Sequence, residues 1–251
     1  MPLMLTLRSL RPVLFAVVTP FMRFWGKLWM RLWGCTVPAS ARINGRPLLW
    51  MHRGRLVIGE RVAISSVSAI YEPGQTFSRC MFSTTPDGLI EIGDDSHLSG
   101  VVISAHKSVT IGKRVMIGGG TRILDSQYHP IDTLPRIPST APEARPIVIE
   151  DDVWLSLDVL VLPGVRIGRG SVIGARSVVT SDIPPMVVAA GIPAKVIRPV
   201  RLPGASMEVD TATDSILPRA SALSPPLQAF DSVFAQTAAS AQAPRARGKP
   251  F

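Results

Sequence analysis

The chain has 251 residues, with 27 lysines and arginines against 18 aspartates and glutamates, and a net charge of +9. This length holds one sizeable domain with appendages. The two cysteines, Cys35 and Cys80, are too few for a disulfide framework and lack metal-site spacing, which argues against a disulfide-rich secreted protein and favours a reducing compartment, the cytoplasm.

The positive charge is concentrated at the N-terminus. No acidic residue precedes Glu60, whereas nine arginines and lysines do, and the rest of the chain is neutral, with 18 basic and 18 acidic residues. Arg23, Lys27 and Arg31 follow one another at a spacing of four, which places them on one face of a predicted helix. Four of the five tryptophans also lie in this part of the chain: Trp25, Trp29, Trp33 and Trp50.

We therefore predict that residues 1–40 form a basic amphipathic segment. The uncharged run Pro12–Met22 is too short to span a bilayer and lacks the cleavage site of a signal peptide. Basic residues with Trp, Phe and Leu suit a helix lying on an anionic membrane, which would make the protein peripheral at the inner face of the membrane. The alternative is a helix packed on the end of the following domain or between subunits. No nucleic-acid partner is predicted, because no binding motif accompanies the charge.

Residues 41–200 carry an aliphatic repeat of six. The most regular stretch places an aliphatic residue at Ile149, Leu155, Val161, Ile167, Ile173 and Val179. Four places after each comes a small or branched residue: Val153, Val159, Val165, Ser171, Ser177 and Ile183. Shorter runs in the same register occur upstream at Ile58, Ile64 and Ile70, at Ile92 and Leu98, and at Ile111, Ile117 and Ile123.

A period of six fits neither a helix nor a simple alternating strand. Six is three strand periods, so a short strand and a tight corner, three times per coil, would point each sixth side chain inward. The repeat predicts a mainly β protein, a parallel β-helix with hexapeptide repeats. The alternative is a β-sandwich, whose strands would alternate with period two between turns every 8–12 residues.

The repeat breaks between Asp125 and Ile147, where the chain has five prolines. A long irregular stretch inside a regular domain marks a functional loop. His129 lies near its start, and histidine can take up a proton near neutral pH, which suits a general base. The alternative is a structural loop histidine. Asp125, four residues earlier, could orient the imidazole or could simply be a solvated loop aspartate.

Other chemistries are poorly supported. His97, His106 and His129 are 9 and 23 residues apart, unlike the ligands of a three-histidine metal site, so no metal is predicted. No nucleophile elbow is present. After about residue 201, Ala, Pro and Ser dominate and the repeat ends, so residues 201–251 are predicted to be a disordered tail.

The C-terminal part of the repeat resembles the hexapeptide-repeat acetyltransferases, in particular the galactoside, maltose and nodulation-factor group and the O-acetyltransferases of surface polysaccharides. The resemblance covers roughly residues 90–200. It rests on Asp152–Ser156, Leu162–Val165, Ile167–Gly168, Val172–Ala175, Val178–Pro185 and Ala190–Arg198.

This resemblance implies a left-handed β-helix and a homotrimer with active sites between neighbouring subunits. It implies acetyl transfer from acetyl-CoA to a hydroxyl, with His129 matching the family's catalytic histidine and Trp154 lining the acyl-donor channel. The residues matched to the family's remaining CoA contacts are Ser156, Ala175, Thr180, Lys195 and Arg198.

Within that set, Lys195 and Arg198 correspond to basic residues near the CoA phosphates. The chain departs from the family at Ser156, where glycine is usual, and at Leu157, where a small polar residue is common.

We therefore predict an acetyl-CoA-dependent O-acetyltransferase that acts on a hydroxyl of a sugar or glycan. One alternative is an N-acetyltransferase of an amino sugar or small xenobiotic. The other is a non-catalytic β-solenoid that binds partners through its flat faces.

Overall fold

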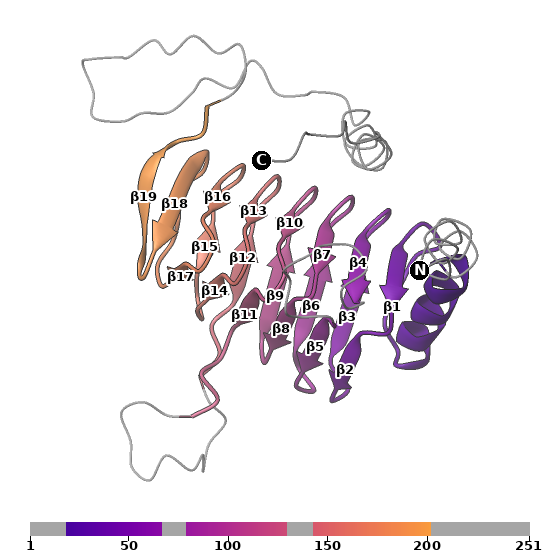
Figure 1. Ribbon diagram of the computed structural model, residues 1–251. Coiled ribbons are helices and arrows are strands. Elements are labelled where there is room, and N and C mark those ends of the chain that lie inside the picture. The colour runs from indigo at the N-terminus through magenta and orange to yellow at the C-terminus, as the bar shows by residue number, and fades with distance from the viewer. Residues whose placement is uncertain (1–18, 67–78, 130–142, 202–251) are drawn as a thin grey trace, which may run out of the picture. The chain divides into compact units, whose positions relative to one another are not determined.

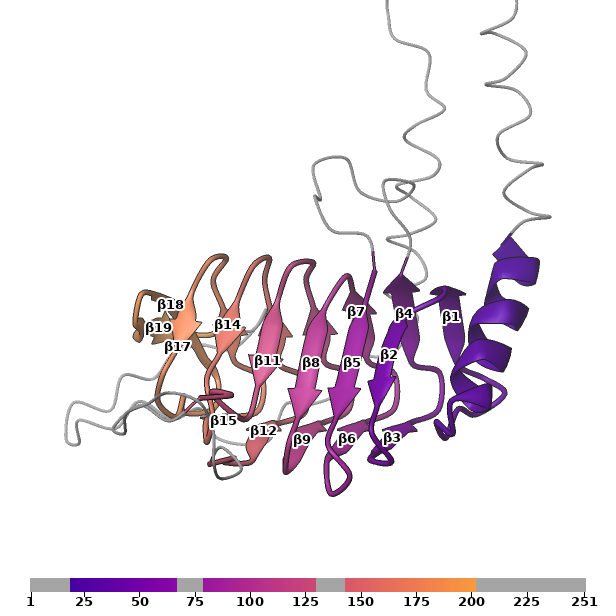
Figure 2. The same ribbon diagram turned by 90° about the horizontal axis from the view of Figure 1, so that it is seen from below.

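The computed structural model describes residues 19–66, 79–129 and 143–201. One helix, over residues 19–32, precedes a stack of strands in three sheets (Figures 1 and 2). The eight-stranded sheet contains β1 (Arg42–Gly45), β4 (Ala63–Ser66), β7 (His97–Ser99), β10 (Met116–Ile117), β13 (Trp154–Leu155), β16 (Val172–Ile173), β18 (Val187–Gly191) and β19 (Ala194–Pro199). The six-stranded sheet contains β2 (Leu48–Met51), β5 (Met81–Thr84), β8 (Val102–Ala105), β11 (Arg122–Leu124), β14 (Leu160–Val161) and β17 (Val178–Val179). The five-stranded sheet contains β3 (Arg55–Ile58), β6 (Leu89–Ile92), β9 (Ser108–Ile111), β12 (Ile147–Ile149) and β15 (Arg166–Ile167).

The chain visits the three sheets in turn. From β1 to β14 each strand pairs in parallel with the strand three places further along the chain. Strand β16 pairs in parallel with β18, and among the named strands only β18 and β19 pair antiparallel. Each strand therefore receives its hydrogen bonds from the coils above and below rather than from its sequence neighbours. The predicted mainly β architecture with parallel strands is confirmed.

The residues that recur with a period of six point into the interior of the coil. All six aliphatic residues from Ile149 to Val179 are completely buried. Residues four places later are buried too, including the hydroxyls Ser171 and Ser177. Ser177 Oγ donates to the carbonyl of Gly174 (2.7 Å) and accepts from the amide of Gly191 (3.0 Å), so its burial leaves no unpaired group. A single coil could not cover these side chains, and stacking buries them at roughly 1.5–3 kcal/mol each.

The coil starts earlier than its most regular repeats. Strand β1 begins at Arg42 and β19 ends at Pro199. His52 follows β2 at the corner between the six- and five-stranded sheets. The six-residue repeat is hard to recognise in residues 42–51, because polar and aromatic residues surround each buried position. Ile70, residues 1–18, most of the predicted loop (130–142) and the predicted tail (202–251) lie outside the described residues.

The N-terminal helix packs against the first coil. Met30 is completely buried and Trp29 packs against the same core. Gly26 faces the β1 region closely enough that a Cβ atom would come within 2.5 Å of the carbonyl oxygen of Gly45. A glycine is needed there because only a helix without a side chain at this point can approach the backbone. Within the described residues, no helix is long and apolar enough to cross a membrane.

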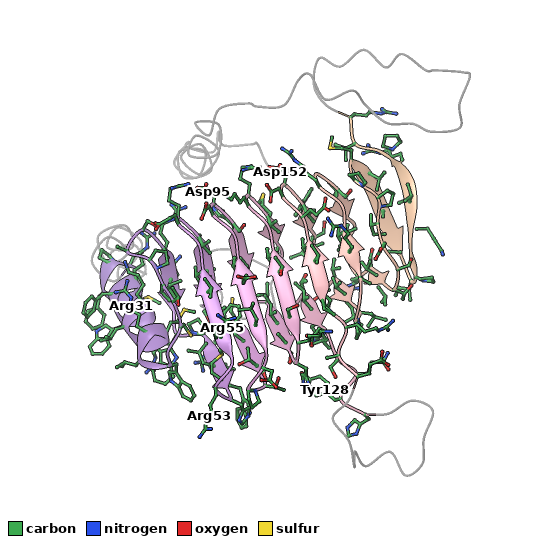
Figure 3. All side chains as sticks on the ribbon, turned by 180° about the vertical axis from the view of Figure 1, so that it is seen from behind. Arg31, Arg53, Arg55, Asp95, Tyr128 and Asp152 are labelled. Carbon is green, nitrogen blue, oxygen red and sulfur yellow. The ribbon has the colours of Figure 1, made fainter. Side chains whose placement is uncertain are left out.

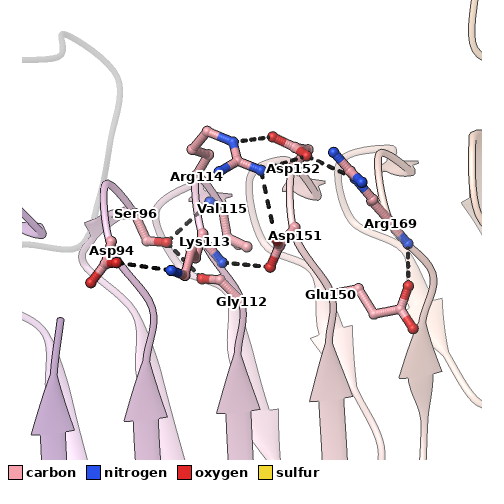
Figure 4. Close-up of polar contacts among 10 residues, drawn as sticks. All are labelled: Asp94, Ser96, Gly112, Lys113, Arg114, Val115, Glu150, Asp151, Asp152 and Arg169. Carbon is pink, nitrogen blue, oxygen red and sulfur yellow. Dashed lines mark hydrogen bonds and ion pairs between the residues drawn. The ribbon is translucent and has the colours of Figure 1, made fainter. Parts of the chain in front are cut away.

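Charged residues alternate in sign along the corner between the five- and eight-stranded sheets (Figure 4). Lys113 Nζ lies 3.1 Å from Asp94 of the preceding coil. Arg114 Nε lies 2.6 Å from Asp152 of the following coil, and Arg169 lies 3.1 Å from the same carboxylate. Each coil thus presents charges opposite to those of its neighbours, which favours stacking in this register. Burial alone would raise the pKa of Asp152, but the hydrogen bonds from Arg114 and Arg169 outweigh it and hold that pKa below its usual value.

Replacing Arg114 with glutamine should therefore weaken stability only where Asp152 is ionised. A carboxylate whose pKa is lowered on folding stabilises the fold above its unfolded pKa of about 3.9, and this contribution is lost as the pH falls through the lower folded value. Because the pair is partly exposed, we expect a loss below about 1 kcal/mol at pH 7. Urea unfolding at pH 7 and pH 3 would measure it. An equal loss at both pH values would show that the ion pair is not its cause.

Candidate active site

His129 lies where the chain leaves the six-stranded sheet. Strand β11 ends at Leu124, Ser126 bridges to Ala144, and His129 is exposed two residues after Gln127, whose carbonyl accepts its amide at 2.7 Å. The described part of this exit, up to residue 129, carries the histidine on the outside of the coil. An exposed imidazole at such a point can reach a substrate that the apolar interior could never admit.

Asp125 holds the backbone in place where the chain leaves the six-stranded sheet. It is completely buried, and its two carboxylate oxygens accept the backbone amides of His106 (2.8 Å) and Lys107 (2.7 Å). Its carbonyl accepts the amide of Arg145, where the chain returns to the coil (2.8 Å). The idea of a solvated loop aspartate is wrong, since the carboxylate is held between two successive coils. Orientation of the imidazole by Asp125 stays a prediction.

Tyr128 covers the adjacent coil beside the histidine. Its hydroxyl donates to Ser104 Oγ at 2.5 Å, and its ring meets the His106 ring edge to face, with centroids 5.0 Å apart. Its φ of 63° lies in the left-handed region, as do those of residues at other corners of the coil, such as Arg53 and Asp95. The contact fixes the start of the loop against β8.

A band of small and apolar residues crosses the last four strands of the eight-stranded sheet. One outward row joins Trp154, Val172, Val188 and Arg198 in register. The next row follows the buried positions with Ser156, Gly174, Ala190 and Lys195. We call these eight residues the Trp154 band.

The two ends of the band differ in character. A Cβ on Gly174 would lie 2.7 Å from that of Ala190, so there is no room for a side chain at Gly174 in the middle of the row. Trp154, 48% exposed, stands at one end, and the exposed cations Lys195 and Arg198 stand at the other. The ends are three strand spacings apart, about 14 Å at roughly 4.8 Å per strand. Such a surface suits a long ligand with an apolar end and an anionic end.

Comparison with known proteins shows sequence similarity to acetyltransferases. A galactoside O-acetyltransferase from Lactococcus lactis is 46% identical over 92 residues, which are 37% of this chain and 44% of that protein. A hexapeptide-repeat acetyltransferase of known structure from Vibrio cholerae is 32% identical, with 57% of this chain and 73% of that chain covered and a TM-score of 0.46. The chain belongs to the hexapeptide-repeat acetyltransferases. This membership rests on the sequence identity and confirms the predicted resemblance.

Further comparisons bear on the fold and on the extent of the match. A second structure of the Vibrio protein, in complex with acetyl coenzyme A, is 29% identical, covers 61% of this chain and 71% of that chain, and has a TM-score of 0.39. AntD, an N-acyltransferase from Bacillus cereus, covers 86% of this chain and 97% of that chain at a TM-score of 0.54 and 14% identity, which shows a shared fold only. The chain spans about half the length of the curated relatives it matches. No family model matches the sequence.

In this hexapeptide-repeat acetyltransferase, most of the predicted donor contacts share one surface. Trp154, Ser156, Lys195 and Arg198 belong to the Trp154 band, and the exposed Ala175 follows Gly174 at its edge. Thr180 is also exposed but follows β17, in the six-stranded sheet.

His129 lies away from this surface, at the corner that follows β11 of the six-stranded sheet. Figure 3 shows its neighbour Tyr128 at the edge opposite to Asp152, the residue that leads into β13. A single chain therefore does not bring His129 onto the Trp154 band.

The sequence interpretation missed Tyr128, Ser104 and His106 as neighbours of the loop. The signal was available, because His106 precedes Asp125 by 19 residues, close to one coil, which stacks the two positions. Among the described residues, no group of three or more His, Cys, Asp or Glu side chains could hold a metal ion. Cys35 and Cys80 are unpaired buried thiols, and burial raises the pKa of each to about 11, which keeps them protonated and unreactive.

Proposed function

We propose that this protein transfers the acetyl group of acetyl-CoA to a hydroxyl of a sugar or glycan. The observation that carries the proposal is the Trp154 band, with an aromatic end, a floor of small residues and two cations at the far end. Acetyl-CoA has the matching order of an uncharged thioester, a thin pantetheine arm and anionic phosphates. The acetyl coenzyme A complex of the Vibrio relative and the name of the Lactococcus relative support the same donor and a sugar acceptor.

In this proposal His129 acts as the general base. Its imidazole takes the proton from the acceptor hydroxyl as the oxygen attacks the thioester carbonyl carbon. The carbon–sulfur bond then breaks, and the imidazolium returns the proton to the departing thiolate, which leaves CoA and an acetyl ester. The exposed position of His129 outside the apolar coil allows it to meet both substrates.

We further infer that the active site forms between subunits. His129 lies at a corner beside the six-stranded sheet, whereas the Trp154 band crosses the eight-stranded sheet, so a complete site needs a second copy to supply one of them. A homotrimer of left-handed β-helices, as the family resemblance implies, would meet this need. Mixing inactive His129→Ala and Trp154→Ala proteins under subunit exchange should restore activity if the two groups act across an interface. No recovery after verified exchange would contradict it.

Turnover of acetyl-CoA with a panel of acceptors tests the activity. Release of the CoA thiol should require a sugar or oligosaccharide hydroxyl, and the product should be a base-labile ester. A base-stable amide formed only with amino sugars would support the N-acetyltransferase alternative. CoA that fails to bind at all would favour the non-catalytic solenoid. The buried, unpaired thiols suit the cytoplasm, where we place the reaction.

Replacing Lys195 with alanine should raise the KM for acetyl-CoA about tenfold and change kcat little, because a phosphate contact far from the thioester contributes to binding rather than to the chemical step. Arg55→Ala is the matched control, since Arg55 is an exposed cation on the five-stranded sheet away from the band. Steady-state kinetics with varied acetyl-CoA would measure both constants. A fall in kcat at unchanged KM would remove Lys195 from the donor site.

A further inference from the structure

The N-terminal helix turns an apolar face outward. Phe21, Phe24, Trp25 and Leu32 are between 46% and 74% exposed, although each is a large hydrophobic side chain. Their spacing of three, four and eleven residues puts them on one side of the helix, and Phe21 and Phe24 both meet the ring of Trp25 edge to face. We call these four residues the outward face.

The basic residues of the same helix are directed at the coil. Arg23 Nε donates to Asn44 Oδ1 (3.0 Å), Lys27 Nζ donates to the carbonyl of Ala39 (3.0 Å), and Arg31 donates twice to the carbonyl of Val37. The three cations therefore share one side of the helix and bind acceptors in residues 37–44, although the Arg31 side chain is itself exposed. Within residues 19–32, the exposed aromatic side chains lie on another side of the helix from these three cations.

An exposed aromatic row of this kind is a site of interaction. Soluble proteins rarely leave several large apolar side chains together in water, and such patches mark contacts with proteins or membranes. The outward face is not needed for packing of the helix, since Met30, Trp29 and Gly26 already fill the contact with the first coil. Its residues are Phe, Trp and Leu, the types that lie at the boundary between headgroups and acyl chains.

Charge distinguishes a bilayer from a second copy of the chain. The first 59 residues contain nine cations and no acidic residue, and Arg42, Arg46, Arg53 and Arg55 are exposed on the first coil. Two copies joined through their outward faces would bring two such basic ends together, which is unfavourable. An anionic bilayer would instead attract the same charges, at about 1 kcal/mol for each cation near the surface.

We propose that the outward face of this helix inserts into the interface of an anionic lipid bilayer and anchors the protein as a peripheral membrane enzyme. Phe21, Phe24 and Trp25 enter the headgroup boundary, and the arginines of the first coil face the lipid phosphates. The helix and β19 lie at opposite ends of the coil (Figure 1), so anchoring leaves the Lys195 end of the Trp154 band away from the membrane. An acceptor attached to a membrane lipid would then be concentrated at the enzyme.

Sedimentation of the full chain with vesicles tests this anchor independently of acetyl transfer. Vesicles of phosphatidylglycerol and phosphatidylcholine in a 1:1 ratio should bind the protein, whereas pure phosphatidylcholine vesicles should bind it at least about tenfold more weakly. The triple variant Phe21→Ser, Phe24→Ser, Trp25→Ser should lose at least about tenfold in binding to the anionic vesicles. The matched control is Ile192→Ser, Val196→Ser, Ile197→Ser, which removes three exposed apolar side chains from the other end of the coil and should bind as the wild type does.

Three results would overturn the anchor. One is a wild-type protein that does not bind anionic vesicles, and another is a triple variant that binds as well as the wild type while its thermal midpoint is unchanged. The third is an oligomer that analytical ultracentrifugation shows to dissociate in the triple variant, without vesicle binding in either protein, because the face would then join copies of the chain. A blue shift of tryptophan emission on anionic vesicles, lost in the triple variant, would place the face in lipid.

Discussion

Replacing His129 with alanine is expected to slow acetyl transfer about 10²- to 10⁴-fold, the usual contribution of a positioned general base. The imidazole is exposed, and Asp125 and the Ser126–Ala144 bridge fix the backbone that supports it. The free energy of unfolding should therefore change by less than about 0.5 kcal/mol. Single-turnover measurement of CoA release at saturating acetyl-CoA separates the chemical step from donor binding, which the substitution should leave intact.

A second exposed histidine provides the control. His52 occupies the corner after β2, in the same column of corners as His129, and its ring lies against Trp50 with centroids 5.6 Å apart. His52→Ala should keep wild-type turnover. If His129→Ala retained more than about a tenth of the wild-type rate, another group would have to accept the hydroxyl proton. The N-acetyltransferase alternative would also be strengthened, since an amine attacks with less need for a base.

The repeated part of the fold could be predicted because one physical constraint acts at every coil. Each inward position must be small or aliphatic to fit a narrow interior. The sequence from Ile149 to Val179 therefore shows an aliphatic residue at every sixth position. The hand of the coil leaves no such mark, because either hand buries the same positions. The Trp154 band could be found only through the family resemblance, since outward small residues resemble ordinary surface positions until the register aligns them.

The exits from the coil were less predictable. Asp125 looks like a loop aspartate in sequence, yet its carboxylate is buried because the amides of the next corner back along the coil need an acceptor. That partnership joins residues 18 and 19 positions apart and depends on how the coils stack. The N-terminal helix was predicted from its i, i+4 basic spacing, but which face packs on the protein depends on Gly26 and on the backbone carbonyls of Val37 and Ala39, between the helix and β1.

Asp125→Ala is expected to be among the most destabilising single substitutions in the chain. It would leave the part-buried amides of His106 and Lys107 without their acceptor, and an unpaired amide costs up to roughly 1–3 kcal/mol when it is fully buried. The free energy of unfolding should fall by roughly 1–4 kcal/mol, as measured by urea denaturation. Asp182→Ala is the matched control, because Asp182 accepts one amide, that of Arg166, at an exposed position. Its loss should stay below about 1 kcal/mol, since water can replace the carboxylate.

Asp125→Asn separates the anchoring role from the predicted orientation of His129. An amide side chain retains one acceptor oxygen but turns an NH₂ group toward the second backbone amide, so stability should fall by roughly half as much as in the alanine variant. If Asp125 only anchors the corner, kcat measured well below the unfolding transition should stay within about twofold of the wild type. If Asp125 also orients the imidazole, kcat should fall about tenfold or more while the KM for acetyl-CoA is unchanged. Unchanged stability in both variants would show that the carboxylate of Asp125 does not hold this corner together, because the amides of His106 and Lys107 would then not depend on it as their acceptor.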